Sequence, residues 1–411
     1  MRKMKRIGGL WAFSGAAAGV LMLVGVASAQ PRYISTEQSG SIVVWPNVAW
    51  DGERDTVIQL TNTHNRMVHA HCFYVNAAPA NPLLPPSVTN PIQWVETDFW
   101  VWLSRQQPTH WSASGGRRVY FGDPFGSDGA GMDVGLVPPV PLGFTGELKC
   151  VQVDDGGAPL RANSLKGEAT LVWDDGDVTQ YNAIALAGNP EDAVGGGDQT
   201  LTLDRTPQNP GGEYNSCPNV LILNHFADGA PDMVLEQEGV CEPVCIGGTA
   251  EGDPCTVDTQ CSGGGRCLAC PVQTQLTLVP CQEDFENQIP GRVTVQFQIF
   301  NEYEQPFSTS TTVDCWLQAN LSSLGAVGAA NPFTFRVLGT LGAHTRITPN
   351  PGNGGVIGVA QEMRRDTSVV PDTEPVGEIG PAARAAFNLH IEGTRFSNAG
   401  VTDRIILPSV E

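Results

Sequence analysis

The chain has 411 residues, with 23 basic and 43 acidic side chains, a net charge of -20 and 11 cysteines. This negative charge argues against nucleic acids and anionic membranes as partners, because both repel an acidic surface. Charged residues make up only 16% of the chain, which excludes a disordered acidic tail. Glycine and proline are frequent and long helical patterns are missing, so the composition indicates a β-rich globular protein.

The first 29 residues have the pattern of a secretory signal peptide. Basic residues between Arg2 and Arg6 precede an apolar stretch, 11–26, and Ala27–Ala29 provides a small-x-small cleavage site. The apolar stretch is short for a membrane span, so we expect cleavage and a mature chain without a transmembrane anchor. Cleavage leaves 19 basic and 43 acidic residues and a net charge of -24. We therefore expect a secreted protein that is extracellular, on the cell surface or in the periplasm.

Short β-rich stretches follow at fairly regular spacing and predict an antiparallel sandwich. The polar residues after Asn62 are expected to connect two paired strands. The expected strands of this first unit are 41–50, 56–62, 68–76, 98–104, 117–122, 146–153 and 167–173.

The second half of the chain repeats this theme. Residues 58–62 read IQLTN and residues 297–301 read FQIFN, and each is followed by a strand with a cysteine beside an aromatic residue, at Cys72 and Cys315. We take this as a weak internal repeat. The expected architecture is all-β, with two immunoglobulin-like antiparallel β-sandwich domains, 30–235 and 273–411, and a small disulfide-rich insert, 236–272.

Six cysteines gather in the insert, with spacings C-x3-C, then nine residues, then C-x5-C-x5-C-x2-C. Zinc sites usually combine two short ligand pairs, and this segment has one C-x2-C and no histidine. An oxidising compartment favours disulfides, so we expect three internal bridges with open connectivity and keep metal or redox chemistry as the alternative. The six are Cys241, Cys245, Cys255, Cys261, Cys267 and Cys270.

Residues 247–267, GGTAEGDPCTVDTQCSGGGRC, resemble the C-x-x-D-x-x-C-x-G-G-x-C modules of secreted and surface proteins of environmental bacteria. One extra residue precedes the last cysteine of the motif. The resemblance implies an extracellular, disulfide-stabilised loop with no activity attached. The flanking strands also resemble uncharacterised secreted bacterial β-proteins. The matching residues are Cys255, Asp258, Cys261, Gly263, Gly264 and Cys267.

Five cysteines lie outside the insert. Cys72 and Cys150 fall on predicted strands of the first unit, so we expect a bridge across that sandwich. Cys281 and Cys315 are expected to do the same in the second unit. Cys217 is then left over, either for another molecule or as a buried thiol.

Candidate metal ligands are few. His69 and His71 point to one face of a predicted strand, and with His64 in the preceding turn they could chelate zinc or copper. We favour a solvent-facing polar pair and keep the metal site as a hypothesis. Calcium is the one cofactor kept as an alternative, at the acidic loops 122–133 and 173–182, although acidic hairpin turns are commoner.

The sequence has no G-x-S-x-G, H-E-x-x-H or P-loop motif. Trp100, Trp102 and Trp111 could stack on sugar rings, but we favour core positions for them. The expected function is a non-enzymatic structural or adhesive protein of the bacterial cell exterior, with other surface or matrix components or further copies of itself as partners. The alternatives are an extracellular carbohydrate-binding or hydrolytic protein and a periplasmic metal-binding module at His69 and His71.

Overall fold

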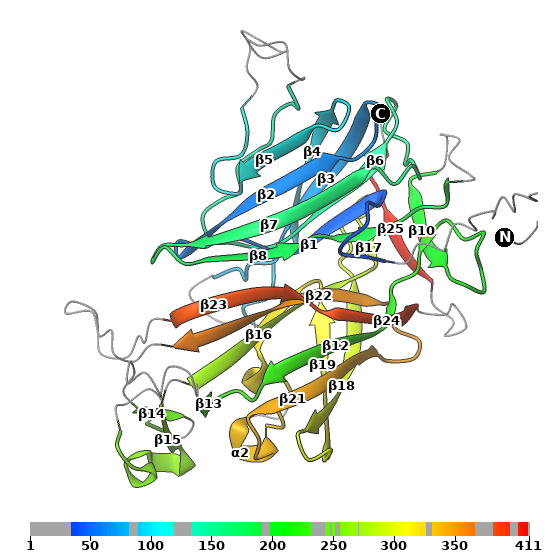
Figure 1. The fold of residues 1–411 in the computed structure, drawn as a ribbon. Coiled ribbons are helices and arrows are strands. Elements are labelled where there is room, and N and C mark those ends of the chain that lie inside the picture. Colours follow the sequence, from blue (N-terminus) through cyan, green and yellow to red (C-terminus); the bar gives the residue numbers. More distant parts are fainter. Residues whose placement is uncertain are drawn as a thin grey trace, which may run out of the picture. The chain divides into compact units, whose positions relative to one another are not determined.

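A computed structural model shows the fold (Figure 1). The expected signal peptide lies outside the described residues. In the part of the chain that the structure describes, no helix has the length and hydrophobicity needed to cross a membrane. The described residues are 34–81, 89–118, 133–190, 198–231, 243–246, 249–250, 255–269, 271–325, 331–365, 381–394 and 402–409.

The first nine strands form one hydrogen-bonded sheet with two layers. The strand order β9-β1-β6-β3-β4 makes the first layer and β8-β7-β2-β5 the second, and the β1–β2 connection joins them through the pair Trp50 and Asp55. We call these two layers the first sandwich. The strands are β1 (Ile42–Trp50), β2 (Arg54–Asn62), β3 (Val68–Asn76), β4 (Val95–Leu103), β5 (Pro108–Ser112), β6 (Phe144–Val153), β7 (Leu165–Trp173), β8 (Val178–Asn182) and β9 (Ile184–Leu186).

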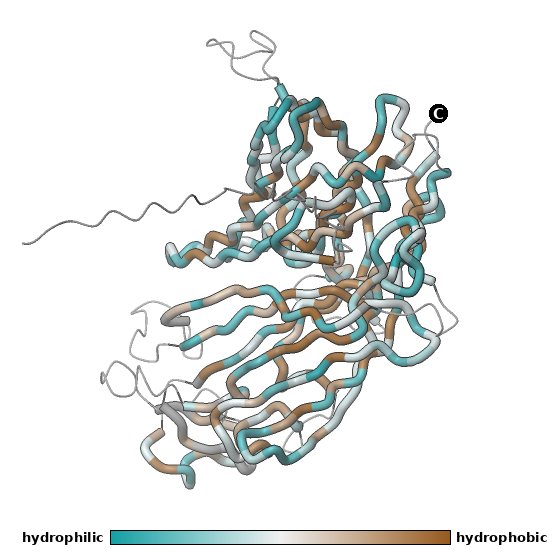
Figure 2. Tube along the Cα trace, turned by 45° about the vertical axis from the view of Figure 1, so that its right-hand side comes forward, coloured by the Kyte–Doolittle hydropathy of each residue, from teal (hydrophilic) through white to brown (hydrophobic). Residues whose placement is uncertain are grey.

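Burial differs between the two layers. Strand β2 alternates buried and half-buried residues, which is the period of a strand with one face in the core. Figure 2 shows hydrophilic and hydrophobic residues alternating along many of the strands. Strands β1 and β3 are instead buried along almost their whole length. A strand that is covered on both faces carries a continuous apolar run, and this explains why residues 42–50 read IVVWPNVAW.

The second cover of this layer is a core to which both halves of the chain contribute. Ile42, Phe73 and Val151 of the first sandwich pack there with Leu203 and Trp316. We call this apolar cluster the shared core. A small sheet borders it, in the order β11-β10-β25-β17. Its strands are β10 (Thr200–Arg205), β11 (Tyr214–Asn215), β17 (Glu283–Asp284) and β25 (Asp403–Ile406).

A second sandwich follows, with the sheets β19-β18-β21-β12-β24 and β13-β16-β22-β23, the latter extended by β20 on β16. Leu223, Leu276, Phe297 and Ile347 are among the residues of its core. Its elements are β12 (Pro218–Phe226), β13 (Ala230–Pro231), β16 (Pro271–Pro280), β18 (Arg292–Asn301), β19 (Pro306–Asp314), β20 (Leu317–Asn320), η4 (Leu321–Ser323), α2 (Phe335–Leu338), β21 (Gly342–Pro349), β22 (Val356–Arg365), β23 (Pro381–Asn388) and β24 (His390–Thr394).

The all-β sandwich expectation is confirmed, while the immunoglobulin-like character stays a prediction. The expected domain boundary at residue 235 differs from the sheets, because β12 and β13 pair within the second sandwich. The expected pairing after Asn62 is also wrong. Strands β2 and β3 lie in different layers, whereas β18 and β19 form a hairpin. The two asparagines do act alike: the Oδ1 atoms of Asn62 and Asn301 accept the backbone N–H two residues on.

The disulfides correct two further expectations. Cys72 and Cys150 are joined, but they are direct partners on β3 and β6, so the bridge lies within one layer instead of crossing the sandwich. Cys217 pairs with Cys281. Cys315, expected to pair with Cys281, is a buried free thiol. Placing β12 in the second sandwich is what brings Cys217 within reach of Cys281.

The insert contains the hairpin of β14 (Pro243–Ile246) and β15 (Arg266–Ala269), with the short helices η2 (Asp258–Gln260) and η3 (Ser262–Gly264). Two of the expected internal bridges are present, Cys245–Cys261 and Cys255–Cys267. The half-cystines themselves form the buried cluster of the insert. Cys241 and Cys270 lie outside the described residues.

Candidate functional site

The predicted metal ligands His69 and His71 belong to a stack of aromatic rings. Both imidazoles are buried, so the solvent-facing pair that we favoured is wrong. His69 stacks on Trp102 with 3.6 Å between ring centroids, and His71 stacks on Trp100 at 3.7 Å. These are the direct partners of the histidines across β3 and β4. We call these four residues the indole–imidazole ladder.

Hydrogen bonds orient the imidazoles of the ladder. His69 Nδ1 lies 3.2 Å from the carbonyl oxygen of Asp154, and His71 Nε2 lies 2.8 Å from Oδ2 of Asp98. Burial lowers the pKa of His69, and the His71 bond lowers the pKa of Asp98. Among the described residues, no group of three ligand atoms includes either histidine. The metal site therefore stays a prediction, while the contacts that the structure shows hold the rings against the indoles.

The tryptophans proposed for sugar stacking are engaged elsewhere. Trp111 is 2% exposed, lies in the core of the first sandwich and donates from Nε1 to the hydroxyl of Tyr74 at 2.6 Å. Replacing it would therefore test core packing. Trp100 and Trp102 are half-buried and already stack on imidazoles. This removes ring surface that a sugar would need.

The acidic loop 173–182 is occupied by an arginine. Arg384 of β23 donates from an Nη atom to Oδ2 of Asp175 at 2.8 Å and pairs with Asp177 at 3.4 Å. Its guanidinium also lies 3.8 Å from the ring centroid of Trp173. A calcium ion here would compete with Arg384 for the same oxygens. Most of the other acidic loop, 122–133, lies outside the described residues.

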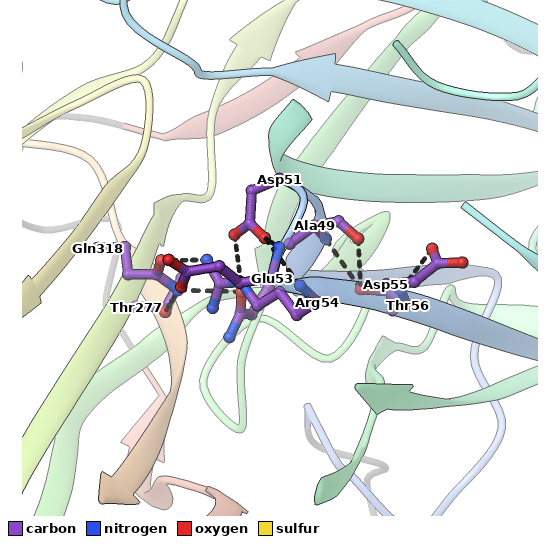
Figure 3. A network of polar contacts seen from close by, with 9 residues as sticks. Ala49, Asp51, Glu53, Arg54, Asp55, Thr56, Thr277 and Gln318 are labelled. Atoms are coloured by element: carbon purple, nitrogen blue, oxygen red, sulfur yellow. Dashed lines mark hydrogen bonds and ion pairs between the residues drawn. The ribbon is translucent and has the colours of Figure 1, made fainter. Parts of the chain in front are cut away.

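The same loop belongs to a band of polar contacts between the sandwiches. Strand β8 lies beside β23, where Asn388 Nδ2 donates to the carbonyl oxygen of Asn182 at 2.6 Å and Oδ1 accepts the Asn182 N–H at 3.0 Å. Arg54 of β2 donates from Nε to Asp51 at 2.6 Å and from an Nη atom to Gln318 of the second sandwich at 2.8 Å (Figure 3). Charged and amide side chains thus bridge the two sandwiches.

Apolar packing reinforces this band. The indole of Trp316 belongs to the shared core and donates from Nε1 to the carbonyl oxygen of Pro46 at 2.8 Å. Pro46 lies where the register of β1 and β6 shifts, between Trp45 and Val48. The bulge leaves the Pro46 carbonyl outside the backbone hydrogen bonds between β1 and β6. The Trp316 indole supplies its hydrogen-bond donor.

The least expected cluster is ionic and buried in the shared core. Lys149 of β6 donates to Oε2 of Glu147 at 2.8 Å and also contacts Oε2 of Glu283 on β17. All three residues are buried. We call them the buried triad. The sequence did not predict it, because Glu147 and Lys149 alternate with other residues in GELKCVQV, and such a pattern is typical of the solvent-exposed face of a strand.

The triad perturbs neighbouring acids. Burial raises the pKa of Glu147 well above its ordinary value, and the Glu283 carboxylate raises it further. Burial alone would lower the pKa of Lys149, but the two glutamates raise it overall. Burial, Asp98 and Glu283 together raise the pKa of Glu96 to about 7. The amine and the carboxyl groups of this cluster therefore titrate as coupled groups.

The insert shows why its motif needs an aspartate and a glycine. Asp258 Oδ1 accepts the backbone N–H of Cys267 at 2.8 Å, which ties η2 to β15. Gly263 has a φ of +73°, where a side chain is strained, and a Cβ there would lie 2.8 Å from the nitrogen of Thr249. The motif residues thus close the loop around its disulfides.

Replacing Asp258 with alanine should loosen the insert alone. Losing this charge-assisted bond at an exposed site is expected to cost about 1 kcal/mol, or about a fivefold faster reduction of the insert disulfides by dithiothreitol. Thiol trapping with peptide mass spectrometry measures each bridge. Asp198→Ala, which removes a similar bond to the Thr200 N–H in the main body, is the control. Equal rates for Asp258→Ala and the wild type would contradict the role of Asp258.

His225 should make the second sandwich sensitive to acid. Burial lowers its pKa to about 4, while its ring bonds to the Phe226 carbonyl and to Thr345. The unfolded chain binds a proton below about pH 6.5 and the folded chain does not, so stability is complete above that pH and is lost as the pH falls toward 4. The shift corresponds to about 3 kcal/mol.

His225→Asn should therefore flatten the fall in free energy of unfolding between pH 7.5 and 4, measured by urea denaturation. His390→Asn, at an exposed residue of β24, is the matched control and should keep the wild-type slope. A His225→Asn variant with the wild-type slope would show that other groups cause the acid sensitivity.

The fold and these contacts define an all-β sandwich protein stapled by disulfides. No protein-family model matches the chain, and no curated protein sequence matches it significantly.

Proposed function

We propose that this chain is a secreted, non-enzymatic structural or adhesive protein of the bacterial cell exterior. The observation that carries the proposal is the layer of β1, β3 and β6, which the core of the first sandwich covers on one face and the shared core covers on the other. Separating the sandwiches would expose this apolar layer to water, so the packing favours a protein that keeps its shape under tension. Four disulfides among the described residues favour an oxidising, non-cytoplasmic compartment.

The second sandwich supplies a candidate adhesive surface. Alternate residues of β18 and β19 are exposed, and in-register rows extend across β21. The side chains are mainly uncharged hydroxyls and amides, in contrast to the acidic chain as a whole. Several weak hydrogen bonds from such a surface suit contacts with hydroxyl-rich polymers or other surface proteins. We call it the polar sheet face, and it consists of Gln296, Gln298, Ser308, Ser310, Arg346 and Thr348.

Binding to isolated cell envelopes of the producing organism tests the proposal. We expect fractionation to find the protein outside the cytoplasm, and the purified protein to sediment with envelopes. The double variant Gln296→Ala, Ser310→Ala removes one cross-strand pair of the polar sheet face. It should bind at least about tenfold more weakly, a loss of about 1.4 kcal/mol.

The matched control is Thr170→Ala, Gln180→Ala, a cross-strand pair on β7 and β8 of the first sandwich. This control should bind like the wild type. Cytoplasmic retention would overturn the secreted role. If the wild-type protein is secreted but does not bind envelopes, the adhesive role is overturned. If both double variants lose the same amount of binding, the polar sheet face is not the binding surface.

A further inference from the structure

The buried triad holds an amine between two carboxyl groups in a place that water does not reach. Phe73 and Val44 are the partners of Lys149 on β3 and β1, and Phe285 stacks on Phe73 with 4.5 Å between centroids. One oxygen of Glu147 and one of Glu283 are buried without a hydrogen-bond partner among the described residues. A buried ion pair often adds little net stability, because removing two charges from water costs about as much as their attraction returns. The triad is therefore a candidate for a chemical role.

The use of lysine here is selective. After residue 29 the sequence contains 17 arginines and only two lysines, Lys149 and Lys166. Between the sandwiches the ion-pairing cations are arginines, as at Arg54 and Arg384. Arginine stays protonated in proteins, whereas a buried lysine can give up its proton and become a nucleophile. One of these two lysines, Lys149, contacts two carboxyl groups. An arginine would supply the positive charge there, but only a lysine supplies an amine that can react.

We propose that Lys149 and Glu283 form an intramolecular isopeptide bond, with Glu147 as the proton relay. A bond forms between Lys149 Nζ and Glu283 Cδ, and the bond between Cδ and one carboxyl oxygen breaks. Two ammonium protons leave with that oxygen as one water molecule, so an ammonium and a carboxylate become an amide and water. No oxidant or other reactant is needed.

The geometry supports these roles. Lys149 Nζ contacts both carboxyls, so Glu147 can accept the amine proton and pass it to the departing oxygen of Glu283. Because the fold already holds the Lys149 amine against the Glu283 carboxyl, the reaction avoids the entropy cost of bringing the two groups together. The two glutamates raise the pKa of Lys149, so the amine becomes a nucleophile only when a base takes its proton. The raised pKa of Glu147 makes its carboxylate a stronger base for this step. Glu147 and Lys149 share β6, whereas Glu283 comes from β17, so the amide would join the first sandwich to the small sheet. This inference does not depend on the proposed function.

Peptide mass spectrometry on the wild-type protein tests the bond. After reduction, alkylation and trypsin digestion, we expect residues 119–161, uncleaved at Lys149, joined to residues 267–292. The species should weigh one water molecule less than the two peptides together. Fragmentation should place the link at Lys149 and Glu283. Separate peptides 119–149, 150–161 and 267–292 in the wild type would overturn the proposal, and so would a link confined to 119–161.

Three variants identify the roles. Lys149→Arg keeps the charge but cannot form the amide, so its digest should contain no joined species. Glu147→Gln should slow bond formation by about 100-fold, the usual range for a proton-transfer group. Lys166→Met should form the bond like the wild type. Circular dichroism checks that each variant folds. A joined species at the wild-type rate in Glu147→Gln would overturn the relay.

Discussion

Replacing Trp316 with alanine is expected to separate the unfolding of the two sandwiches. The side chain is 7% exposed, packs in the shared core and donates to Pro46 of β1. Its loss should cost about 3–5 kcal/mol through the cavity that it leaves. The unpaired Pro46 carbonyl adds a desolvation penalty. Because this side chain packs against both sandwiches, its removal weakens their coupling and not only one core.

Urea denaturation followed by far-UV circular dichroism measures this effect. We expect one transition in the wild type and two in Trp316→Ala. Trp111→Ala removes the same side chain from the core of the first sandwich alone, and should lower the midpoint while leaving a single transition. A single transition in Trp316→Ala, displaced by less than in Trp111→Ala, would show that other contacts hold the sandwiches together.

Lys149→Met should be the most damaging change of a charged residue. It leaves the carboxyls of Glu147 and Glu283 buried without the Lys149 nitrogen, whether that nitrogen is an ammonium or part of the proposed amide. Removing one member of a buried cluster in this way costs about 3–5 kcal/mol. The raised pKa of Glu147 sets the sign of the pH dependence. A raised carboxyl pKa makes the ionised form unfavourable, so the loss should be largest near pH 8 and shrink as the pH falls and the carboxyls become protonated.

Urea denaturation at pH 8 and pH 5 checks this expectation. Lys166→Met, on the outer side of β7, is the matched control and should change stability by less than about 1 kcal/mol. If Lys149→Met cost no more than Lys166→Met, the triad would not be holding β6 and β17 together.

Strand positions follow well from local pattern. The expected strand 68–76 coincides with β3, and 167–173 lies within β7, because alternation and β-branched residues are local properties. Sheet membership is not local. The sequence around Cys217 gives no sign that β12 pairs with β21 and β24, so its disulfide partner could not be predicted.

The site was harder to predict for the same reason. His69 and His71 were placed on one strand face correctly, but their burial depends on the Trp100 and Trp102 side chains of β4. Lys149 was hidden because a polar residue between apolar neighbours normally faces water. Its burial depends on Glu283, 134 residues away along the chain.

The small sheet also sets the order of events during biosynthesis. Strand β10 pairs with β25, whose partner positions run from Thr200 with Ile406 to Leu203 with Asp403. Residues of both strands line the core that covers the first sandwich. A nascent chain therefore cannot complete the shared core before residues 403–406 have been synthesised, and such distant pairing slows folding. An export pathway that requires unfolded chains would gain time from this delay.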